Sequence, residues 1–325
     1  MSLPSAASPI WERRQAMDEI TVAAPASTAN LGPGFDVFGL ALDCFADIVS
    51  VTKTDKPGIT ITGDDIPTDP AKNTAGIVAG MMTRDLGLPG GLDISITKNV
   101  PVGCGLGSSA ASAAAAAVAV NMLFDLRLDS NAIVKFAGAG EMASAGTIHY
   151  DNVAASAIGN FVLVKTDPLD IITVSPPRDL VLCVSIPLGQ RDIEKKTEKA
   201  RKVLPPSVSL RDHVYNMSNA AAMVSGFFTG DLKLIGSAMR DVIVEPARGR
   251  TIPGYDAVRR HAMDAGALGV AISGAGPSMI AFVSGARDAE AVSSSMRKAY
   301  DLLGLASRCE ICRPAAGAGP LGDSG

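Results

Sequence analysis

Short stretches in which apolar and polar residues alternate predict the β-strands of this chain. They cover residues 20–24 (ITVAA), 48–51, 59–61 and 93–97 (DISIT). Alternation predicts strands because successive side chains of a strand point to opposite faces. We expect 48–51 and 59–61 to pair with each other. Later apolar runs, 161–165, 179–187 and 268–283, predict further strands, the last with a glycine turn inside it.

Apolar residues spaced three and four apart predict helices between these strands. In residues 73–86 the apolar positions are Ile77, Val78, Met81 and Met82, and Gly87 ends the run. An alanine-rich helix is expected to reach about residue 126, and the next helix to begin at an N-cap, Ser130. Other predicted helices cover residues 193–204, 216–228, 255–265 and 286–303.

Strands and helices are mixed without strict alternation, which favours an α+β fold over a doubly wound parallel sheet. Within residues 166–178, Asp167-Pro168 and Pro176-Pro177 indicate a boundary between two domains. We expect a disordered extension over 1–17, an N-terminal domain over 18–170, a C-terminal domain over 171–313 and a flexible tail over 314–325. Met17 is a second candidate for the natural start.

Composition limits the partners of the protein. The 325 residues suggest two domains, and 47% hydrophobic with 19% charged residues is typical of a globular chain. A net charge of -4 disfavours nucleic acid as a partner, and no apolar stretch is long enough to predict a membrane span. Five cysteines without a paired framework or a complete zinc motif indicate reduced thiols in a cytoplasmic protein.

A glycine-rich loop before the alanine helix is the strongest candidate for chemistry. In VPVGCGLGSSAASAAAAAVAVN (100–121), Gly103, Gly105 and Gly107 alternate before Ser108 and Ser109. Glycines expose backbone N–H groups, and a helix N-terminus favours anions, so the loop can hold phosphate. It lacks the lysine of the P-loop and the third glycine of the dinucleotide motif. A purely structural turn stays open as the alternative.

Three further stretches, in this order with the glycine loop, carry a resemblance to a known family. They are PASTANLGPGFD (25–36), EMASAGTIHYDN (141–152) and SGAGPS (273–278). Together the four stretches resemble the GHMP kinase superfamily, over about 18–313. PASTANLGPGFD and EPARGRTIPGYDAV (245–258) are most similar to its homoserine kinase family.

The resemblance implies a fold and a reaction. The fold is a two-domain GHMP kinase fold, with an N-terminal domain like domain 2 of ribosomal protein S5 and a ferredoxin-like C-terminal domain. The reaction is the phosphorylation of the side-chain hydroxyl of L-homoserine by ATP with Mg²⁺, a step toward threonine. ATP would bind the N-terminal domain, and homoserine would bind between the domains.

The resemblance also implies the residues that bind ATP and metal. Ser109 and Glu141 would hold Mg²⁺; the residues alone favour an exposed helical charge for Glu141. Lys98 is expected to be a surface lysine at a strand end. The nucleotide-binding residues would be Pro101, Gly103, Gly105, Leu106, Gly107, Ser108, Ser109 and Ala110.

For the acceptor, the resemblance implies binding residues from both domains. Arg201 and Arg248 would bind the carboxylate, since a guanidinium suits it, and Asn30 and Asp36 the amino and hydroxyl end. Thr197, on the same helical face as Arg201, would face the reacting hydroxyl. His149 would line the acceptor pocket, and a structural histidine is an equal alternative.

Asn152 lies where other superfamily members have a catalytic aspartate, and an amide cannot accept a proton. Asp151 is adjacent, but on an extended segment it would point to the opposite face. The predicted catalytic residues are therefore Asn152, Thr197 and Arg201, with the hydroxyl proton passing to the phosphate or to solvent.

Other functions stay open at this point. They are phosphorylation of another small alcohol, such as shikimate or a mevalonate derivative, and a nucleotide-binding sensor without catalysis. A dehydrogenase is disfavoured by the incomplete glycine motif. A homodimer is compatible with the sequence.

Overall fold

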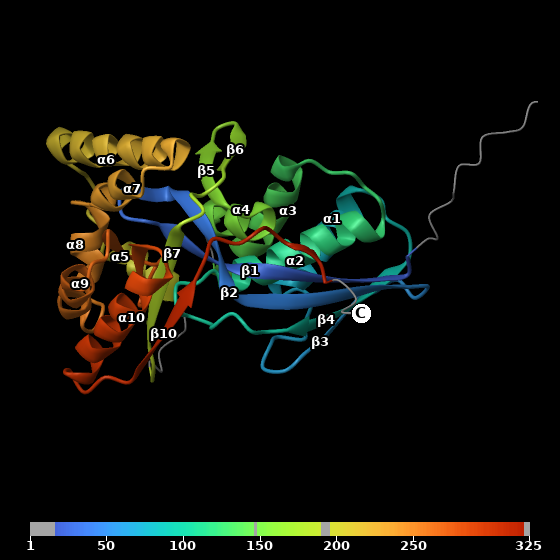
Figure 1. Cartoon of the computed structure of the whole chain (residues 1–325). Coiled ribbons are helices and arrows are strands. Elements are labelled where there is room, and N and C mark those ends of the chain that lie inside the picture. Colours follow the sequence, from blue (N-terminus) through green and yellow to red (C-terminus); the bar gives the residue numbers. More distant parts are fainter. Residues whose placement is uncertain (1–16, 146–147, 190–195, 322–325) are drawn as a thin grey trace, which may run out of the picture.

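Two lobes make up the computed structural model, which describes residues 17–145, 148–189 and 196–321 (Figure 1). The expected extension therefore lies outside the described residues except for Met17. The N-terminal lobe contains β1 (Glu19–Asn30), β2 (Gly34–Thr54), β3 (Gly58–Thr62), α1 (Thr74–Asp85), β4 (Gly91–Thr97), α2 (Ser108–Leu123), α3 (Ser130–Ala145), α4 (Tyr150–Ile158), β5 (Phe161–Thr166) and β6 (Leu169–Val174). The predicted two-domain α+β organisation is confirmed.

The sheet of the N-terminal lobe differs from the expected pairing. Its strands run in the order β11-β1-β2-β4-β3, where β11 is Gly319–Pro320, and β5 pairs with β2 and β6. The predicted pairing of β2 with β3 is wrong, because β4 lies between them and pairs parallel with β3. Helix α1 connects β3 to β4, and such a crossover is what a parallel pair requires.

Helices α1 to α4 lie over one face of this sheet (Figure 1). The alanine helix α2 is central among them, and its alanines from Ala110 to Ala119 are at most 1% exposed. Small side chains let neighbouring elements approach closely while favouring helix. Of the described residues, no helix is both long and apolar enough to cross a membrane.

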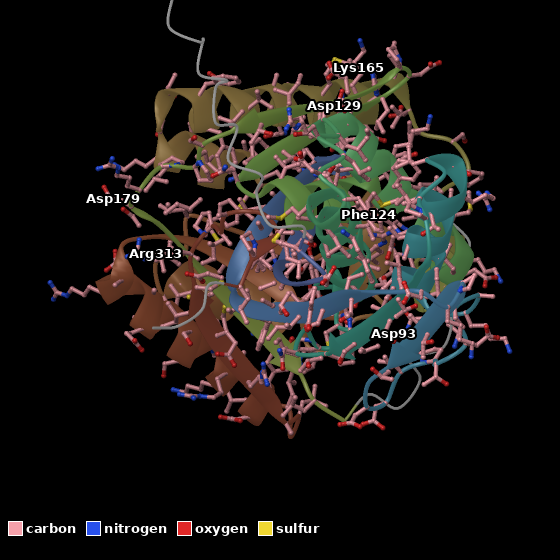
Figure 2. All side chains as sticks on the ribbon, turned by 90° about the vertical axis from the view of Figure 1, so that its right-hand side faces the viewer. Asp93, Phe124, Asp129, Lys165, Asp179 and Arg313 are labelled. Atoms are coloured by element: carbon pink, nitrogen blue, oxygen red, sulfur yellow. The ribbon has the colours of Figure 1, made fainter. Side chains whose placement is uncertain are left out.

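Two predicted boundaries move. Asp129 rather than Ser130 caps α3, because its carboxylate accepts the Ala132 N–H at 2.8 Å. Asn131 of α3 donates to Asp170 of the β5–β6 hairpin at 3.3 Å, and Figure 2 labels Asp129 at the start of α3 and Lys165 on that hairpin. Because β6 continues to Val174 and pairs with β5, the boundary expected after residue 170 would cut a strand. The N-terminal domain therefore extends to Val174.

The C-terminal lobe is a second, four-stranded sheet with helices. It contains β7 (Leu180–Pro187), α5 (Lys196–Lys202), α6 (Leu210–Thr229), α7 (Leu232–Ala238), α8 (Val244–Gly249), α9 (Tyr255–Asp264), β8 (Gly269–Ile272), β9 (Met279–Ser284), α10 (Ala286–Asp301) and β10 (Ser307–Cys312). The strand order β10-β7-β9-β8 is antiparallel throughout, with helices between β7 and β8 and between β9 and β10. This arrangement is the expected ferredoxin-like one.

Residues 313–321, which we call the C-terminal strap, return to the N-terminal lobe (Figure 1). The strap forms β11 (Gly319–Pro320) on the edge of β1, and Ala318 N–H donates to the Ser156 carbonyl of α4 at 2.9 Å. The flexible tail expected over 314–325 is thus wrong for 314–321; residues 322–325 lie outside the described residues. Small residues allow this approach, since a Cβ at Gly317 would lie 2.4 Å from Ala157 O.

Candidate active site

One cavity of about 610 Å³ runs between the glycine loop and the C-terminal lobe. The structure brings every residue of the predicted site to its wall: Asn30, Asp36, Pro101, Gly103, Gly105, Leu106, Gly107, Ser108, Ser109, Ala110, Glu141, His149, Asn152, Thr197, Arg201 and Arg248. These residues come from both lobes and from positions far apart in the sequence. Their shared location is established, and their individual roles stay predictions.

The glycine loop places the N-terminus of α2 at the cavity. Gly103, Gly105 and Gly107 have φ values of 70°, 74° and 67°, in the left-handed region that favours glycine. Gly107 is the N-cap residue of α2, and no side chain caps the helix there. The first-turn residues Ser108 and Ser109 line the cavity. A 16-residue helix with an N-terminus capped by no side chain offers N–H donors and partial positive charge to an anion.

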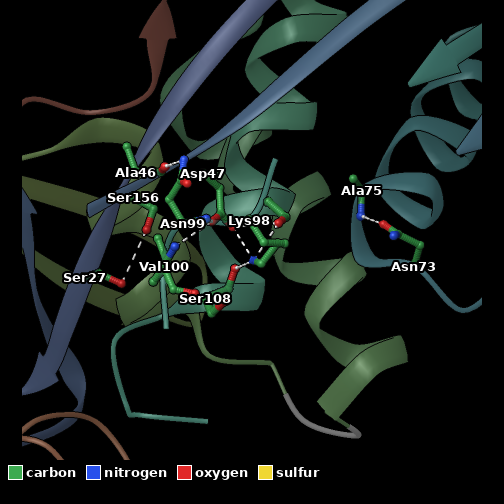
Figure 3. Close-up of polar contacts among 11 residues, drawn as sticks. Ser27, Ala46, Asp47, Asn73, Ala75, Lys98, Asn99, Val100, Ser108 and Ser156 are labelled. Carbon is green, nitrogen blue, oxygen red and sulfur yellow. Dashed lines mark hydrogen bonds and ion pairs between the residues drawn. The ribbon is translucent and has the colours of Figure 1, made fainter. Parts of the chain in front are cut away.

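A buried ion pair beneath the loop holds its two ends together (Figure 3). Asp47 on β2 is fully buried and accepts the N–H groups of Asn99 and Val100, each at 3.0 Å. Lys98 pairs with Asp47 and donates to the Ser108 carbonyl at 2.6 Å. The expectation of a surface lysine is therefore wrong, since its side chain is 17% exposed. Burial lowers the pKa of Lys98, and Asp47 opposes that shift.

The turn of the C-terminal lobe that contains SGAGPS packs directly on the glycine loop. Ser273 Oγ donates to Gly105 O at 2.7 Å, and Ser278 N–H donates to Cys104 O at 3.3 Å. A Cβ at Gly105 would lie 2.2 Å from Ser273 O. The nucleotide loop is thus shaped by both lobes.

The acceptor end of the cavity carries charges of both signs. Arg201 donates to both carboxylate oxygens of Asp36 at 2.9 Å. Arg248 is 3% exposed and donates to Gly274 O at 2.9 Å, the same carbonyl that accepts from Asn30 at 2.8 Å. Burial lowers the pKa of Arg248, and Asp36 opposes that shift. Such a surface suits a small molecule with an anionic and a cationic group.

Glu141 and His149 form a buried pair beside the helix N-terminus. Glu141 is 3% exposed, and its carboxylate lies 3.0 Å from His149 Nδ1. Burial alone would lower the pKa of His149, but the hydrogen bond and charge of Glu141 outweigh it, so the pKa is raised. The exposed helical charge that the residues alone favoured for Glu141 is not what the structure shows.

Asp151 and Asn152 both lie in the first turn of α4 and both line the cavity. The expected extended segment with opposite faces is therefore wrong. Asp151 Oδ1 accepts the backbone N–H of Asn152 at 2.8 Å and its side-chain Nδ2 at 3.2 Å, and Ser27 Oγ donates to Asn152 Oδ1 at 3.1 Å. Burial, followed by the charge of Asp36, raises the pKa of Asp151 to about 6. The Asn152 amide is thus held from two sides.

Comparison with known proteins agrees with this geometry. Models described as "GHMP kinases N terminal domain" and "GHMP kinases C terminal" match residues 73–160 and 223–302. The homoserine kinase of Thermoplasma volcanium is 40% identical over 88% of this chain and 92% of its own length. The chain belongs to the GHMP kinase family. The homoserine kinase of Methanopyrus kandleri is 44% identical over 86% of this chain and 92% of its own.

A solved homoserine kinase structure extends the match to the whole fold of this GHMP kinase. The protein from Cytophaga hutchinsonii superposes with a TM-score of 0.88 at 38% identity, covering 94% of this chain and 98% of that one. At 38% identity the two proteins are similar in sequence as well as in fold. Both lobes, and the cavity between the glycine loop and the C-terminal lobe, therefore belong to a kinase.

The residues present fit the Mg²⁺ that a kinase of this family implies. Ser109 and Glu141 supply a hydroxyl and a carboxylate at the cavity wall, next to the N-terminus of α2. Mg²⁺ prefers oxygen ligands and commonly keeps several waters, so one or two protein ligands suffice.

Sequence reasoning missed several residues of the GHMP kinase site. Phe35 lies between the arginines, with its ring centroid 5.4 Å from Arg201 Cζ and 5.2 Å from Arg248 Cζ. Its place inside PASTANLGPGFD was the available signal. Asp47 gave none, because 51 residues separate it from Lys98. Asp65, Ile66, Pro67, Ala71, Lys72 and Thr74 also contribute to the cavity wall.

Proposed function

We propose that this kinase transfers the γ-phosphoryl group of ATP to the side-chain hydroxyl of L-homoserine, with Mg²⁺, giving O-phospho-L-homoserine. One observation carries the proposal. A single cavity joins a helix N-terminus suited to phosphate with a pair of opposite charges suited to a zwitterionic amino acid.

On the donor side, backbone amides of the glycine loop and of the first turn of α2 bind the phosphates. Ser109 and Glu141 hold Mg²⁺, which when bound neutralises charge on the phosphate oxygens. Lys98 and Asp47 fix the loop beneath. Phosphoryl transfer requires mainly position and charge stabilisation, so these groups supply most of what the donor needs.

On the acceptor side, Arg248 and Arg201 bind the carboxylate and Asp36 binds the ammonium group. Arg201 and Asp36 form an ion pair with each other in this structure. A bound zwitterion can replace that pairing, since its carboxylate can pair with Arg201 and its ammonium group with Asp36. Asn30 shares a carbonyl acceptor with Arg248, which ties the two ends of the acceptor site together. Thr197 also lines the cavity, and its role in this proposal is to face the reacting hydroxyl.

Asn152 positions the hydroxyl of homoserine. Its amide oxygen accepts from Ser27 and its amide nitrogen donates to Asp151, so the group has a fixed orientation. It cannot accept the proton, which passes to the transferred phosphate or to solvent. Asp151 orients Asn152 and is not the base.

We also propose that the reaction takes place in the cytoplasm. The reason is that its two substrates, free ATP and a free amino acid, must both reach this cavity, and the cytoplasm supplies both.

A coupled ADP-release assay with a panel of alcohols tests the proposal. L-homoserine should give turnover, with shikimate and mevalonate near background, and mass spectrometry should find O-phospho-L-homoserine. Turnover with another alcohol alone would refute the substrate and leave the kinase. ATP binding without ADP release for any alcohol would instead favour a nucleotide-binding sensor.

A further inference from the structure

Two cysteines from different lobes lie opposite each other where the chain crosses between the lobes. Leu42 on β2 and Pro314 form an antiparallel bridge, and Asp43 N–H donates to Arg313 O at 3.1 Å. Because the pairing is antiparallel, two residues forward from Leu42 and two residues back from Pro314 place Cys44 opposite Cys312. Interaction with the Cys44 thiol, together with burial, raises the pKa of the Cys312 thiol.

The backbone geometry at this pair is compatible with a disulfide. Asp43 N–H donates to Arg313 O, and Arg313 N–H donates to the Asp43 side chain at 2.8 Å. Extending the register of the Leu42–Pro314 bridge past this pair places Cys44 and Cys312 at a non-hydrogen-bonded step. At such steps the Cα atoms of opposite residues are about 4.5 Å apart. Disulfides form across Cα separations of roughly 4.4 to 6.8 Å.

One thiol of the pair is accessible and the other is covered. Cys44 is half-buried, and Cys312 is 4% exposed. Residues 43–45 of β2 are skipped in its pairing with β1, because the register shifts between Pro25 and Ala26. This part of β2 is therefore available to the end of β10, and Arg308 of β10 stacks over the Phe45 ring at 4.5 Å.

We propose that Cys44 and Cys312 form an intramolecular disulfide when the folded enzyme meets a low-molecular-weight disulfide oxidant. The Cys44 thiolate attacks the oxidant, forms a mixed disulfide and releases one small thiol. The Cys312 thiolate then attacks the Cys44 sulfur and releases the second small thiol. The two cysteines are oxidised, the oxidant is reduced to two thiols, and the two protein protons pass to those thiols.

The bond would join β10 to β2 directly before the C-terminal strap. The strap binds the Ser156 carbonyl near the end of α4, the helix whose first turn contains Asp151 and Asn152. Neither cysteine lines the cavity of about 610 Å³. We therefore expect the disulfide to raise thermal stability and to leave kcat unchanged.

The chain contains a matched control pair. Cys183 and Cys309 lie on neighbouring strands, but Cys183 is opposite Ile311 and Cys309 opposite Ser185, so they are diagonal. Cys183 Sγ donates instead to Ala289 O at 3.3 Å. Diagonal Cα atoms are about 7 to 8 Å apart, beyond the reach of a disulfide. Cys309→Ser should therefore leave the oxidation unchanged, and Cys44→Ser should abolish it.

The experiment treats the native full-length chain with oxidised glutathione. Free thiols are counted after denaturation, linked peptides are mapped by mass spectrometry, and Tm is measured before and after. We expect two of the five thiols to be lost, a Cys44–Cys312 peptide, and a Tm higher by roughly 5 °C that dithiothreitol reverses.

Three results would overturn the proposal. They are five free thiols after treatment, a bond between other cysteines or between two chains, and a stable glutathione adduct on Cys44 without a bond to Cys312. Cys312→Ala is the reference for the last result, because in that variant the glutathione adduct on Cys44 is the only product available. An adduct that persists in the native chain as it does in Cys312→Ala would overturn the proposal, whereas an adduct that converts to the Cys44–Cys312 bond shows only that closure is slow.

Discussion

Replacing Gly105 by alanine should separate the two lobes at the nucleotide loop. The new Cβ would lie 2.2 Å from Ser273 O, against a lower limit of 3.0 Å for real contacts. The neighbouring atoms are backbone and cannot rotate away. Either the glycine loop or the turn from the C-terminal lobe must therefore move by about 0.8 Å, which breaks the Ser273 to Gly105 hydrogen bond.

The expected size of the effect follows from this displacement. A shift of about 1 Å in a positioned reactant costs on the order of 100-fold in rate. Gly105 also has φ +74°, so any alanine there carries a left-handed backbone cost of about 1 to 2 kcal/mol in stability. We expect kcat/KM for ATP to fall about 100-fold in Gly105→Ala.

Gly87→Ala isolates the backbone cost. Gly87 has φ +62°, and a Cβ there meets no atom within 4 Å. It should lose about 1 kcal/mol of stability and keep its kinetic constants within about twofold. ATP saturation curves at fixed homoserine, with thermal melts of both variants, make the comparison. Equal kcat/KM values for ATP in the two variants would refute the role assigned to the contact between the lobes.

Three further predictions concern the acceptor site. Arg248→Lys keeps the positive charge but loses the two parallel N–H donors of the guanidinium, so KM for homoserine should rise about 30-fold, or about 2 kcal/mol. Arg250→Lys, at an exposed arginine, should change this KM less than about twofold. Equal effects of the two variants would contradict carboxylate binding by Arg248. Asp151 has its pKa raised to about 6 by burial, so its stabilising contribution is lost as pH rises through about 6. The Tm of Asp151→Asn relative to that of the wild type should therefore increase as pH rises from about 4 to about 8. The variant should keep most of kcat, and a near-total loss of kcat in a folded variant would make Asp151 the base. Asp36→Ala should damage turnover of homoserine far more than turnover of 4-hydroxybutanoate, which lacks the ammonium group, and equal losses would remove Asp36 from ammonium binding.

Local patterns predicted the parts of the molecule whose geometry depends on neighbours in the sequence. The glycine loop needs its left-handed residues and its following helix, and both are visible in GCGLGSSAAS. Helix α1 has its apolar spacing and its N-cap, Asn73, within one short segment. The residues of the four motifs accordingly lie on one cavity.

Contacts between distant segments were beyond these patterns. Lys98 looked like a surface residue because its partner Asp47 lies on another strand, and only the packed sheet buries both. The C-terminal strap looked like a tail because glycine, alanine and proline carry no periodicity. Asp151 was misplaced because α4 begins two residues before Asn152, with no side-chain cap to mark its start.

A crystal structure with L-homoserine and a nonhydrolysable ATP analogue, grown with Mg²⁺, tests the central claim most directly. The account predicts phosphates on the amides of the loop from Gly103 to Ser109, Mg²⁺ between Ser109 and Glu141, and the homoserine carboxylate on Arg248 with its hydroxyl facing Asn152. Homoserine bound outside this cavity, or with its carboxylate toward Asp36, would contradict the account.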